Sequence, residues 1–291
     1  MEQLQAFPEP PRHSSLDDYL AESVEVVEQA KADHAVSRTF LLLSGGNDSL
    51  VLLDTMASLA DEIVHIDTGI GIPETNAFAE RVARRYGLPY TVLTPPTSYE
   101  ELVFSRWRGM PGPGAHRYTY QRLKERCVEA LIRSHRTKRG QRFGLMTGVR
   151  RAESRRRMGY GDPVNRTGGQ VWINPLLWWP NEEMAGYRSA QSLPVNEVSA
   201  NLHMSGECLC GAMADQGEDR EERAAIRFFY PEFDRRLCQI ENECRNRGLP
   251  YTEWGVKRDP KAVAADREAA GMLCQSCAYR QPSLDFGGQQ S

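Results

Sequence analysis

Residues 40–59 constrain the fold of this chain more than any other stretch. A short run of Phe and Leu at 40–43 has the pattern of a buried strand and stops at Ser-Gly-Gly, and an apolar-periodic helix pattern follows at 50–59. Two adjacent glycines allow a tight turn and the close approach of a ligand. Because the amides and the dipole of a helix start favour negative charge, this order predicts a phosphate-binding loop.

The glycine turn matches neither of two common phosphate-binding types. No Gly-Lys-Ser/Thr closes it, as a Walker loop requires, and the dinucleotide-binding pattern G-x-G-x-x-G is absent. Residues 44–49, SGGNDS, instead resemble the PP-loop of the ATP pyrophosphatases, SGGxDS, whose members cleave ATP between the α and β phosphates. A plain strand-to-helix turn with a glycine pair is the alternative interpretation.

Strand and helix patterns alternate along the first two thirds of the chain, which predicts an α/β fold with a parallel sheet and crossover helices. The turn Asp67-Thr68-Gly69 follows a strand, as Ser44 does, so we expect both at the carboxyl edge where such sheets bind ligands. Residues 106–114 read as a lid-like loop near that edge. The expected strands are residues 40–43, 63–66, 90–93, 142–147 and 171–173.

Five blocks in order resemble the phosphoadenosine phosphosulfate (PAPS) reductase family of PP-loop proteins. They are SGGNDS (44–49), HIDTGIGIPET (65–75), TGVRRAESRRR (147–157), INPLLWWPNEEM (173–184) and LPVN (193–196). The resemblance implies a Rossmann-like, adenine nucleotide alpha hydrolase-like sheet flanked by helices. We expect an N-terminal leader and helix at 1–37, this domain at 38–198 and a cysteine-rich helical region at 199–291. Asn47 is a departure, because many members carry Lys there.

The resemblance places ATP on the loop, with a Mg²⁺ ion beside it. Asp48 is the expected catalytic carboxylate and magnesium ligand, since Mg²⁺ takes one or two carboxylates plus phosphate oxygens; a charge that only stabilises the helix start is the alternative. The expected nucleotide-binding residues are Ser44, Gly45, Gly46, Asn47, Asp48, Ser49, Asp67, Thr68, Gly69, Thr147 and Gly148.

Two arginines after the fourth expected strand, Arg150 and Arg151, are the other predicted catalytic residues, because guanidinium groups bind phosphate or sulfate through two hydrogen bonds. The arginines at 155–157 are either further anion ligands or a solvated basic turn. A second basic run, RSHRTKRGQR at 133–142, is either a solvated helix end or a nucleic-acid contact.

Seven cysteines in a chain with a polar, proline-containing N-terminal stretch favour metal ligation over disulfides and predict a cytoplasmic protein. Two close pairs, Cys208/Cys210 and Cys274/Cys277, are the expected ligands of a [4Fe-4S] cluster. Structural Zn²⁺ and free thiols or a redox pair are the alternatives. Cys127 lies in a helix expected at about residues 118–133. It is a reserve ligand, because relatives often place a cysteine in that helix.

Net charge, hydropathy and the histidine pattern bear on three further classes of protein: nucleic-acid-binding proteins, membrane proteins and zinc hydrolases. The formal net charge is −3, so global charge does not call for a nucleic-acid partner, and no run approaches the roughly 20 apolar residues of a membrane span. An apolar share of 40% suffices for a core. No His-Glu-x-x-His pattern occurs, which disfavours a zinc hydrolase.

The resemblance implies enzymatic sulfur chemistry. Assimilatory reductases of the family use a cysteine in a C-terminal tail, whereas no cysteine follows Cys277 here. We therefore expect an ATP pyrophosphatase that adenylates a substrate oxygen for replacement by sulfur, similar to the ATPase components of DNA phosphorothioation systems. Its partners would be a cysteine desulfurase or other sulfur donor, and DNA or other modification subunits. The alternatives are a sulfonucleotide reductase that uses Cys210 or Cys277, and a non-catalytic nucleotide-binding scaffold.

Overall fold

The computed structural model, which describes residues 13, 15–153, 162–214 and 221–257, contains a six-stranded sheet in the order β3-β2-β1-β4-β6-β5. All neighbouring strands are parallel except β5, which is antiparallel to β6. The strands are β1 (Val36–Leu42), β2 (Glu62–Ile66), β3 (Tyr90–Leu93), β4 (Arg142–Met146), β5 (Val164–Thr167) and β6 (Gln170–Ile173).

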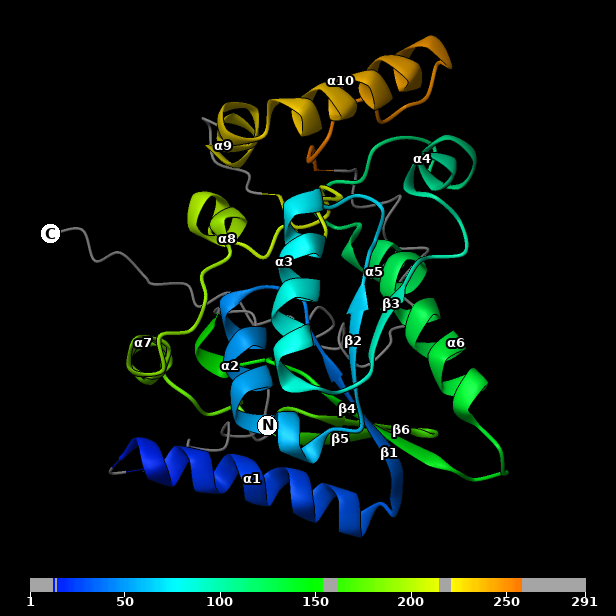
Figure 1. Cartoon of the computed structure of the whole chain (residues 1–291). Helices are drawn as coiled ribbons and strands as arrows, with labels where there is room; N and C mark the ends of the chain where they lie inside the picture. The colour runs from blue at the N-terminus through cyan, green and yellow to red at the C-terminus, as the bar shows by residue number, and fades with distance from the viewer. Residues whose placement is uncertain (1–12, 14, 154–161, 215–220, 258–291) are drawn as a thin grey trace, which may run out of the picture.

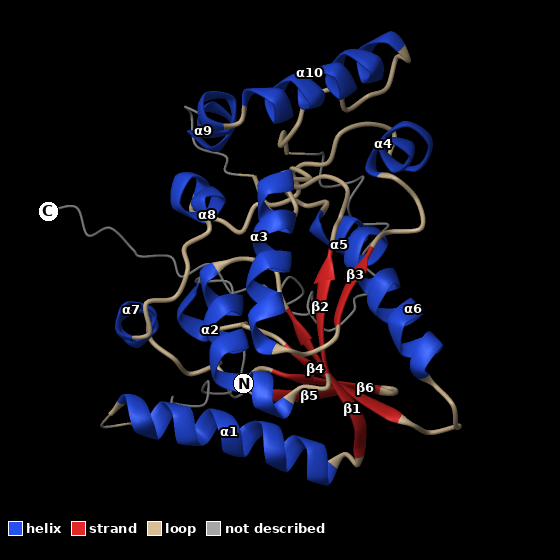
Figure 2. Cartoon of the chain, viewed as in Figure 1, coloured by secondary structure: helices blue, strands red, loops and turns tan. Residues whose placement is uncertain are grey.

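Helices cover both faces of the sheet and its carboxyl edge (Figures 1 and 2). Within the described residues no helix is both long enough and apolar enough to cross a membrane. The helices are α1 (Leu16–Asp33), α2 (Asn47–Met56), α3 (Pro73–Ala83), α4 (Tyr99–Glu101), α5 (His116–Tyr120), α6 (Arg126–His135), α7 (Asn181–Ala190), α8 (Glu197–Leu202), α9 (Glu221–Phe229) and α10 (Pro231–Asn246).

Alternation along the strands divides the core between the two faces of the sheet. Leu41 and Ile63 point to the face covered by α1, α2, α3 and α7. Phe40 and Val64, one residue away in the same strands, point to the face covered by α6. All four are at most 1% exposed. A strand buried on both faces must be apolar throughout, which explains the continuous apolar run at 40–43.

The strand order creates a switch point between β1 and β4. The chain continues from β1 to β2 on one side, whereas β4 lies on the other side of β1 and leads towards β6. The loops that leave β1 and β4 at their carboxyl ends therefore diverge, and ligands of open α/β sheets bind in the crevice between such loops. The loop at 44–46 and the segment from Thr147 to Arg150 are these two exits.

A separate apolar core lies at the carboxyl edge of the sheet. It contains Ile70, Ile72 and Tyr99 from the expected nucleotide-binding domain, and Leu209 and Trp254 from the expected C-terminal region. In Figure 1, α9 and α10 lie beyond this edge, at the top of the view. The described residues from 199 onwards thus share a core with residues 70–123, and the boundary at 198 remains a prediction.

Three local expectations change in the structure. The β5 strand, which had no expected counterpart, pairs with β6 across the turn at Gly168 and Gly169. The expected helical region from 199 onwards contains two successive helices, α9 and α10, because Pro231 starts a new helix at its first position. The expected lid at 106–114 is packed down rather than open: Met110 N donates to Tyr251 O at 2.8 Å, and Gly255 N donates to Pro111 O at 3.1 Å.

Candidate functional site

Hydroxyl groups close the loop between β1 and α2 on itself. Ser44 Oγ lies 3.1 Å from Ser49 Oγ, and Ser49 Oγ donates to Gly46 O at 2.9 Å. The Gly46 amide lies 3.4 Å from Ser44 Oγ. Gly45 has a φ of +79°, a conformation that only glycine adopts freely, and it reverses the chain into the helix. These contacts give the loop a defined shape before any ligand binds.

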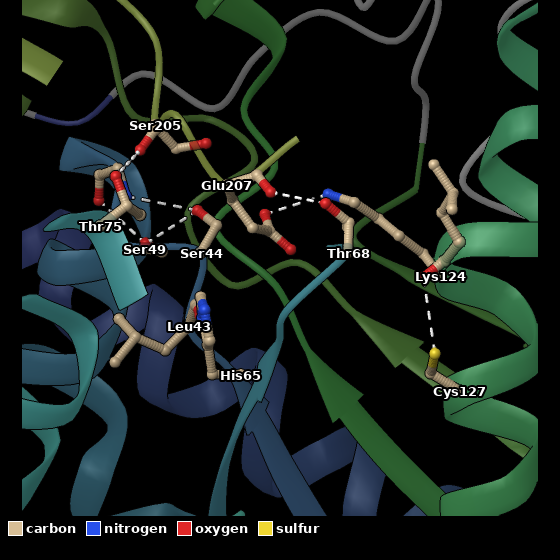
Figure 3. Close-up of polar contacts among 12 residues, drawn as sticks. Leu43, Ser44, Ser49, His65, Thr68, Thr75, Lys124, Cys127, Ser205 and Glu207 are labelled. Carbon is tan, nitrogen blue, oxygen red and sulfur yellow. Dashed lines mark hydrogen bonds and ion pairs between the residues drawn. The ribbon is translucent and has the colours of Figure 1, made fainter. Parts of the chain in front are cut away.

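Neighbouring side chains explain why both loop positions are glycine. A Cβ added at Gly45 would lie 3.0 Å from Thr75 Cγ2, and one added at Gly46 would lie 3.1 Å from Ser205 Cβ. Thr75 and Ser205 are themselves joined, because Thr75 Oγ1 donates to Ser205 O at 2.7 Å. Figure 3 shows Ser44, Ser49, Thr75 and Ser205 gathered together. Protein packing, and not only ligand approach, therefore requires the glycine pair.

The start of α2 is suited to bind an anion. Gly46 is the N-cap residue, and it makes no side-chain capping bond. The amides of the first turn are therefore not taken up by a cap, and the dipole of this ten-residue helix adds positive potential there. A glycine loop that leads into an uncapped helix is the arrangement that binds phosphate or sulfate oxygens.

The exit of β4 lies against this helix start. A Cβ at Gly148 would lie 2.8 Å from the carbonyl carbon of Asp48. Arg150 is 5% exposed, and its Nε lies 3.0 Å from Asp48 Oδ2. Its Nη1 donates to Trp179 O at 3.0 Å and to Asn181 Oδ1 at 3.1 Å. The structure thus brings Asp48, Gly148 and Arg150 together, with the guanidinium already engaged by protein groups.

Other predicted anion ligands lie further out or outside the described residues. The Arg151 guanidinium carbon lies 5.3 Å from the centre of the Trp178 ring, a cation–π contact. Thr147, at the end of β4, donates from its hydroxyl to Asn174 Oδ1. The arginines at 155–157 lie outside the described residues. Of the predicted arginine pair, Arg150 contacts the loop through Asp48.

The turn Asp67-Thr68-Gly69 is covered by the segment that follows α8. Thr68 Oγ1 donates to Glu207 O at 2.7 Å, and Arg236 of α10 donates to Gly69 O at 2.7 Å. Two backbone bonds run alongside, from Leu209 N to Ile70 O at 2.7 Å and from Ile72 N to Gly206 O at 2.8 Å. Asp67 Oδ1 accepts from Gly69 N at 2.9 Å, so this carboxylate caps its own turn.

A half-buried ion pair lies next to this turn. Lys124 Nζ lies 3.0 Å from Glu207 Oε2, and Figure 3 shows both side chains beside Thr68. Burial would lower the pKa of Lys124, but the carboxylate of Glu207 and the neighbouring thiols raise it above its ordinary value. Lys124 and Glu207 were not singled out from the sequence, because their pairing joins the helical turn Gln121–Glu125, just before α6, to a segment 83 residues away.

The two described cysteines of the expected metal set differ in chemistry. A hydrogen bond from Cys210 and the nearby Lys124 ammonium, acting against burial, lower the pKa of Cys208 to about 7. The same hydrogen bond and burial raise the pKa of Cys210 well above its ordinary value. Burial raises the pKa of Cys127 to about 11, and its Sγ donates to Leu123 O at 3.4 Å.

The described cysteines do not by themselves form a complete set of ligands for a metal cluster. Across the described part of the chain, no group of three or more His, Cys, Asp or Glu side chains is arranged to hold a metal ion. Cys274 and Cys277 lie outside the described residues, so the four-cysteine site remains a prediction. For Mg²⁺, Asp48 is the first expected side-chain ligand and Asp67 a further candidate, and phosphate oxygens and water would supply the others.

Two buried side chains that contact the loop were missed as site residues. Asn196 Nδ2 donates to Gly45 O at 2.9 Å, and His65 Nδ1 lies 2.7 Å from Leu43 O. Both residues stand inside blocks of the family resemblance, LPVN and HIDTGIGIPET, which was the only available signal. Neither a single Asn nor a single His has a local pattern that indicates a contact with a distant loop.

Comparisons with known proteins give a consistent result. A family model described as "Phosphoadenosine phosphosulfate reductase domain" matches residues 38–205. The chain is 30% identical over 206 residues to a phosphoadenosine 5'-phosphosulfate reductase of Synechocystis sp., covering 69% of this chain and 76% of the relative. It is 27% identical over 186 residues to an adenosine 5'-phosphosulfate reductase of Deinococcus radiodurans, covering 59% and 66%. A solved PAPS reductase from Candida auris is 19% identical, with a TM-score of 0.44, and covers 66% of this chain and 94% of that one.

Proposed function

The chain belongs to the phosphoadenosine phosphosulfate reductase family, and from this membership we propose that it is an enzyme that binds an adenylyl sulfonucleotide and reduces its sulfate group. Both curated relatives are named as reductases of such nucleotides. This proposal takes up the reductase alternative of the sequence analysis, which the comparisons favour over a phosphorothioation ATPase. The observation that carries it is the meeting of the 44–49 loop with Gly148 and Arg150 at the switch point of the sheet.

The loop supplies the binding chemistry for the anionic part of the nucleotide. The uncapped amides of α2 are hydrogen-bond donors for phosphate or sulfate oxygens. The hydroxyls of Ser44 and Ser49 donate within the loop and would have to turn away from these bonds to donate to the anion. Arg150 lies behind the loop and balances Asp48, so that the carboxylate does not repel the incoming anion. The site therefore offers donors at its surface and keeps its one acidic loop residue paired.

Reduction also requires a thiol, because two electrons must reach the sulfate sulfur. Of the two thiols expected for this role, Cys210 is buried with a raised pKa, which disfavours it as the attacking group. Cys277 lies outside the described residues. Separate serine replacements of Cys208, Cys210, Cys274 and Cys277 identify the thiol: the essential one abolishes sulfite release and leaves nucleotide binding unchanged.

Sulfite release tests the proposal directly. The purified protein is incubated with phosphoadenosine phosphosulfate or adenosine phosphosulfate and reduced thioredoxin, and sulfite is measured. We expect sulfite from one of the two nucleotides and a large loss of rate in Ser49→Ala. Lys138→Ala is the matched control, since Lys138 is exposed in the loop before β4, at the opposite edge of the sheet. Nucleotide binding without sulfite, with every reductant tried, contradicts the reductase assignment.

An ATP pyrophosphatase is the second candidate. The Asp48 side chain is 22% exposed at the start of α2, where a carboxylate suits a Mg²⁺ ion shared with a triphosphate. A sulfur donor, DNA and modification subunits would be partners of an ATP pyrophosphatase, and the reductase proposal does not call for them. Pyrophosphate release from ATP that stops when EDTA removes Mg²⁺, without sulfite release, supports it over the reductase. Sulfite release that persists in EDTA favours the reductase.

A further inference from the structure

Leu43 leads into the nucleotide loop (residues 44–49), and both its N–H and its carbonyl group are hydrogen-bonded to β2. Leu43 N donates to Val64 O at 2.8 Å, which continues the parallel pairing by one residue beyond β1. The Leu43 carbonyl accepts a side-chain bond: His65 Nδ1 lies 2.7 Å from it. Ser44, the first loop residue, follows directly. Figure 3 shows His65 and Leu43 side by side below Ser44.

The His65 ring joins two structural elements. A carbonyl oxygen only accepts, so Nδ1 is the donor to Leu43. On the other side of the ring, Nε2 lies 2.9 Å from the side-chain amide of Asn76, in the first turn of α3. With Nδ1 as the donor, a neutral ring accepts at Nε2, so the Asn76 amide forms this bond by turning its nitrogen towards the ring. His65 is 1% exposed, so water does not replace either bond when it is lost. The ring thereby ties the entrance of the loop to α3.

We propose that His65 is a positioning residue for the nucleotide loop, which it holds by donating from Nδ1 to the Leu43 carbonyl. With the Leu43 carbonyl held by His65 and the Gly45 carbonyl held by Asn196, the peptide groups of the loop are fixed by their acceptor ends. The Gly46 amide, opposite the Gly45 carbonyl, faces Ser44 Oγ, so these bonds hold the loop in one shape before an anion binds at the start of α2. The inference rests on the proposed function only for the identity of the ligand.

Two conservative variants separate the two bonds of the ring. In His65→Asn the amide nitrogen takes the place of Nδ1, so the donor to Leu43 is kept and the contact with Asn76 is lost. In His65→Gln the amide nitrogen takes the place of Nε2, so the contact with Asn76 is kept and the donor to Leu43 is lost. Because each variant leaves one buried bond, both are expected to lose similar thermal stability.

The loop itself provides a readout that needs no ligand. Amide hydrogen exchange of a peptide covering residues 43–50 is compared in the two variants and the wild type. We expect exchange about ten-fold faster than wild type in His65→Gln, and near wild type in His65→Asn. Equal exchange in the two variants overturns the proposal and leaves His65 as a packed core residue.

Binding of phosphoadenosine phosphosulfate, measured by calorimetry, is the second readout. His65→Gln should weaken the Kd about ten-fold, the effect of about one buried hydrogen bond, and His65→Asn should bind as the wild type does. Rescue by Asn but not Gln is a pattern that general destabilisation does not produce. If the wild type binds no adenylyl nucleotide, the proposed function fails, while the exchange experiment still decides the role of His65.

Discussion

Asn196 joins three separate segments of the chain at the nucleotide loop. Its Nδ2 donates to Gly45 O at 2.9 Å and lies 3.3 Å from Thr75 Oγ1. Its Oδ1 accepts from Val198 N at 3.1 Å and so caps α8. The residue is 2% exposed, which makes each of these bonds costly to leave unsatisfied. One amide thus fixes the loop, α3 and α8 relative to one another.

Replacing Asn196 by Asp separates capping from loop support. The carboxylate still accepts from Val198 N, but it cannot donate to Gly45 O and brings negative charge to an anion-binding loop. We expect phosphoadenosine phosphosulfate to bind about ten-fold more weakly or worse. The comparison with Asn196→Ala, which loses the cap as well, is made by calorimetry and thermal melting. Unchanged binding in the Asp variant would mean that the Gly45 carbonyl needs no partner.

At this scale the sequence predicted which residues gather, but not what each one contacts. The glycine pair, Asp48 and Gly148 come together because each follows a strand end of one parallel sheet, a relation that periodicity reveals. The partners of Arg150 are the Trp179 carbonyl and Asn181, about 30 residues away and fixed by a turn after β6. No spacing rule connects them, so only the folded chain shows that this guanidinium is engaged by protein groups.

The pair α9–α10 is held by a buried ionic group. Arg223 is 8% exposed and donates from Nε to Asp234 Oδ1, while Arg227 Nε lies 3.3 Å from Asp234 Oδ2. Arg223 also lies over the Trp254 ring, with its guanidinium carbon 5.6 Å from the ring centre. This group links two helices and the segment that follows them, and helix patterns alone do not indicate it.

Acid should weaken this helix pair through Asp234. Burial raises its pKa, but the hydrogen bonds and charges of Arg223 and Arg227 together lower it below its ordinary value. A carboxyl group with a depressed folded-state pKa contributes stability above its unfolded pKa, about 3.9, and loses that contribution as the pH falls through the folded value. Melting temperatures of wild type and Asp234→Asn should therefore differ at pH 6 and converge towards pH 3. Parallel curves would show that Asp234 contributes nothing.

A predicted lid proved to be a packed segment, and this can be tested with one methyl group. A Cβ at Gly112 would lie 1.7 Å from Val256 O, whereas one at Gly186, within α7, meets nothing within 4 Å. Gly112→Ala should cost about 1–3 kcal/mol and speed proteolysis around residues 251–257. Gly186→Ala should be neutral or stabilising, because alanine favours a helix over glycine. Equal melting temperatures for the two variants would show that segment 109–112 is not closely packed.

Elements with strong apolar periodicity were predicted well, and weakly patterned ones were not. The strands β2, β3 and β4 occupy the expected residues within one position. β2 and β4 are internal and mostly buried, whereas β3 lies at the edge of the sheet and is recognised by its β-favouring residues, Tyr-Thr-Val-Leu. β5 has the residues VNRT, two of them exposed, at the edge of the sheet. An edge strand needs no apolar run, so nothing in its composition distinguishes it from a loop.

On the scale of the whole molecule, the six-stranded sheet and the C-terminal helices are not independent. The core at the carboxyl edge combines Ile70 and Tyr99 with Leu237 and Trp254. Trp254 Nε1 donates to Leu209 O at 2.7 Å, and Tyr99 OH donates to Cys210 O at 2.9 Å. The cysteine-rich region was expected from composition alone, and composition does not reveal a shared core.

A chain cut after Ser205 should fail to fold cooperatively, although it retains the whole family match. The cut removes the partners of Ile70, Tyr99 and Trp107 and exposes their apolar surface. A chain cut after Lys257 keeps every described residue and serves as the control. Circular dichroism and thermal melting of both report the outcome. A soluble, cooperatively melting 1–205 fragment would show that the shared core is dispensable.

The same control fragment addresses the predicted cluster, because it lacks Cys274 and Cys277 but keeps Cys208 and Cys210. If the four-cysteine prediction holds, the full chain purified without oxygen contains iron and the 1–257 fragment does not. Iron and zinc are measured by elemental analysis, and visible absorption reports a cluster. Equal iron in both proteins would exclude Cys274 and Cys277 as ligands, and zinc in place of iron would favour the structural alternative.

The contact of Gly148 with the start of α2 limits which substitutions can change the anion-binding site at the loop. A Cβ there would meet the backbone of Asp48 and Ser49 at 2.8–3.0 Å, so main chain touches main chain across the gap. The distance between the exit of β4 and the start of α2 is therefore set by backbone atoms, and a change of side-chain rotamer does not alter it. Substitutions that adapt the loop to larger or smaller oxyanions would therefore begin at Thr75 and Ser205, whose side chains lie against Gly45 and Gly46.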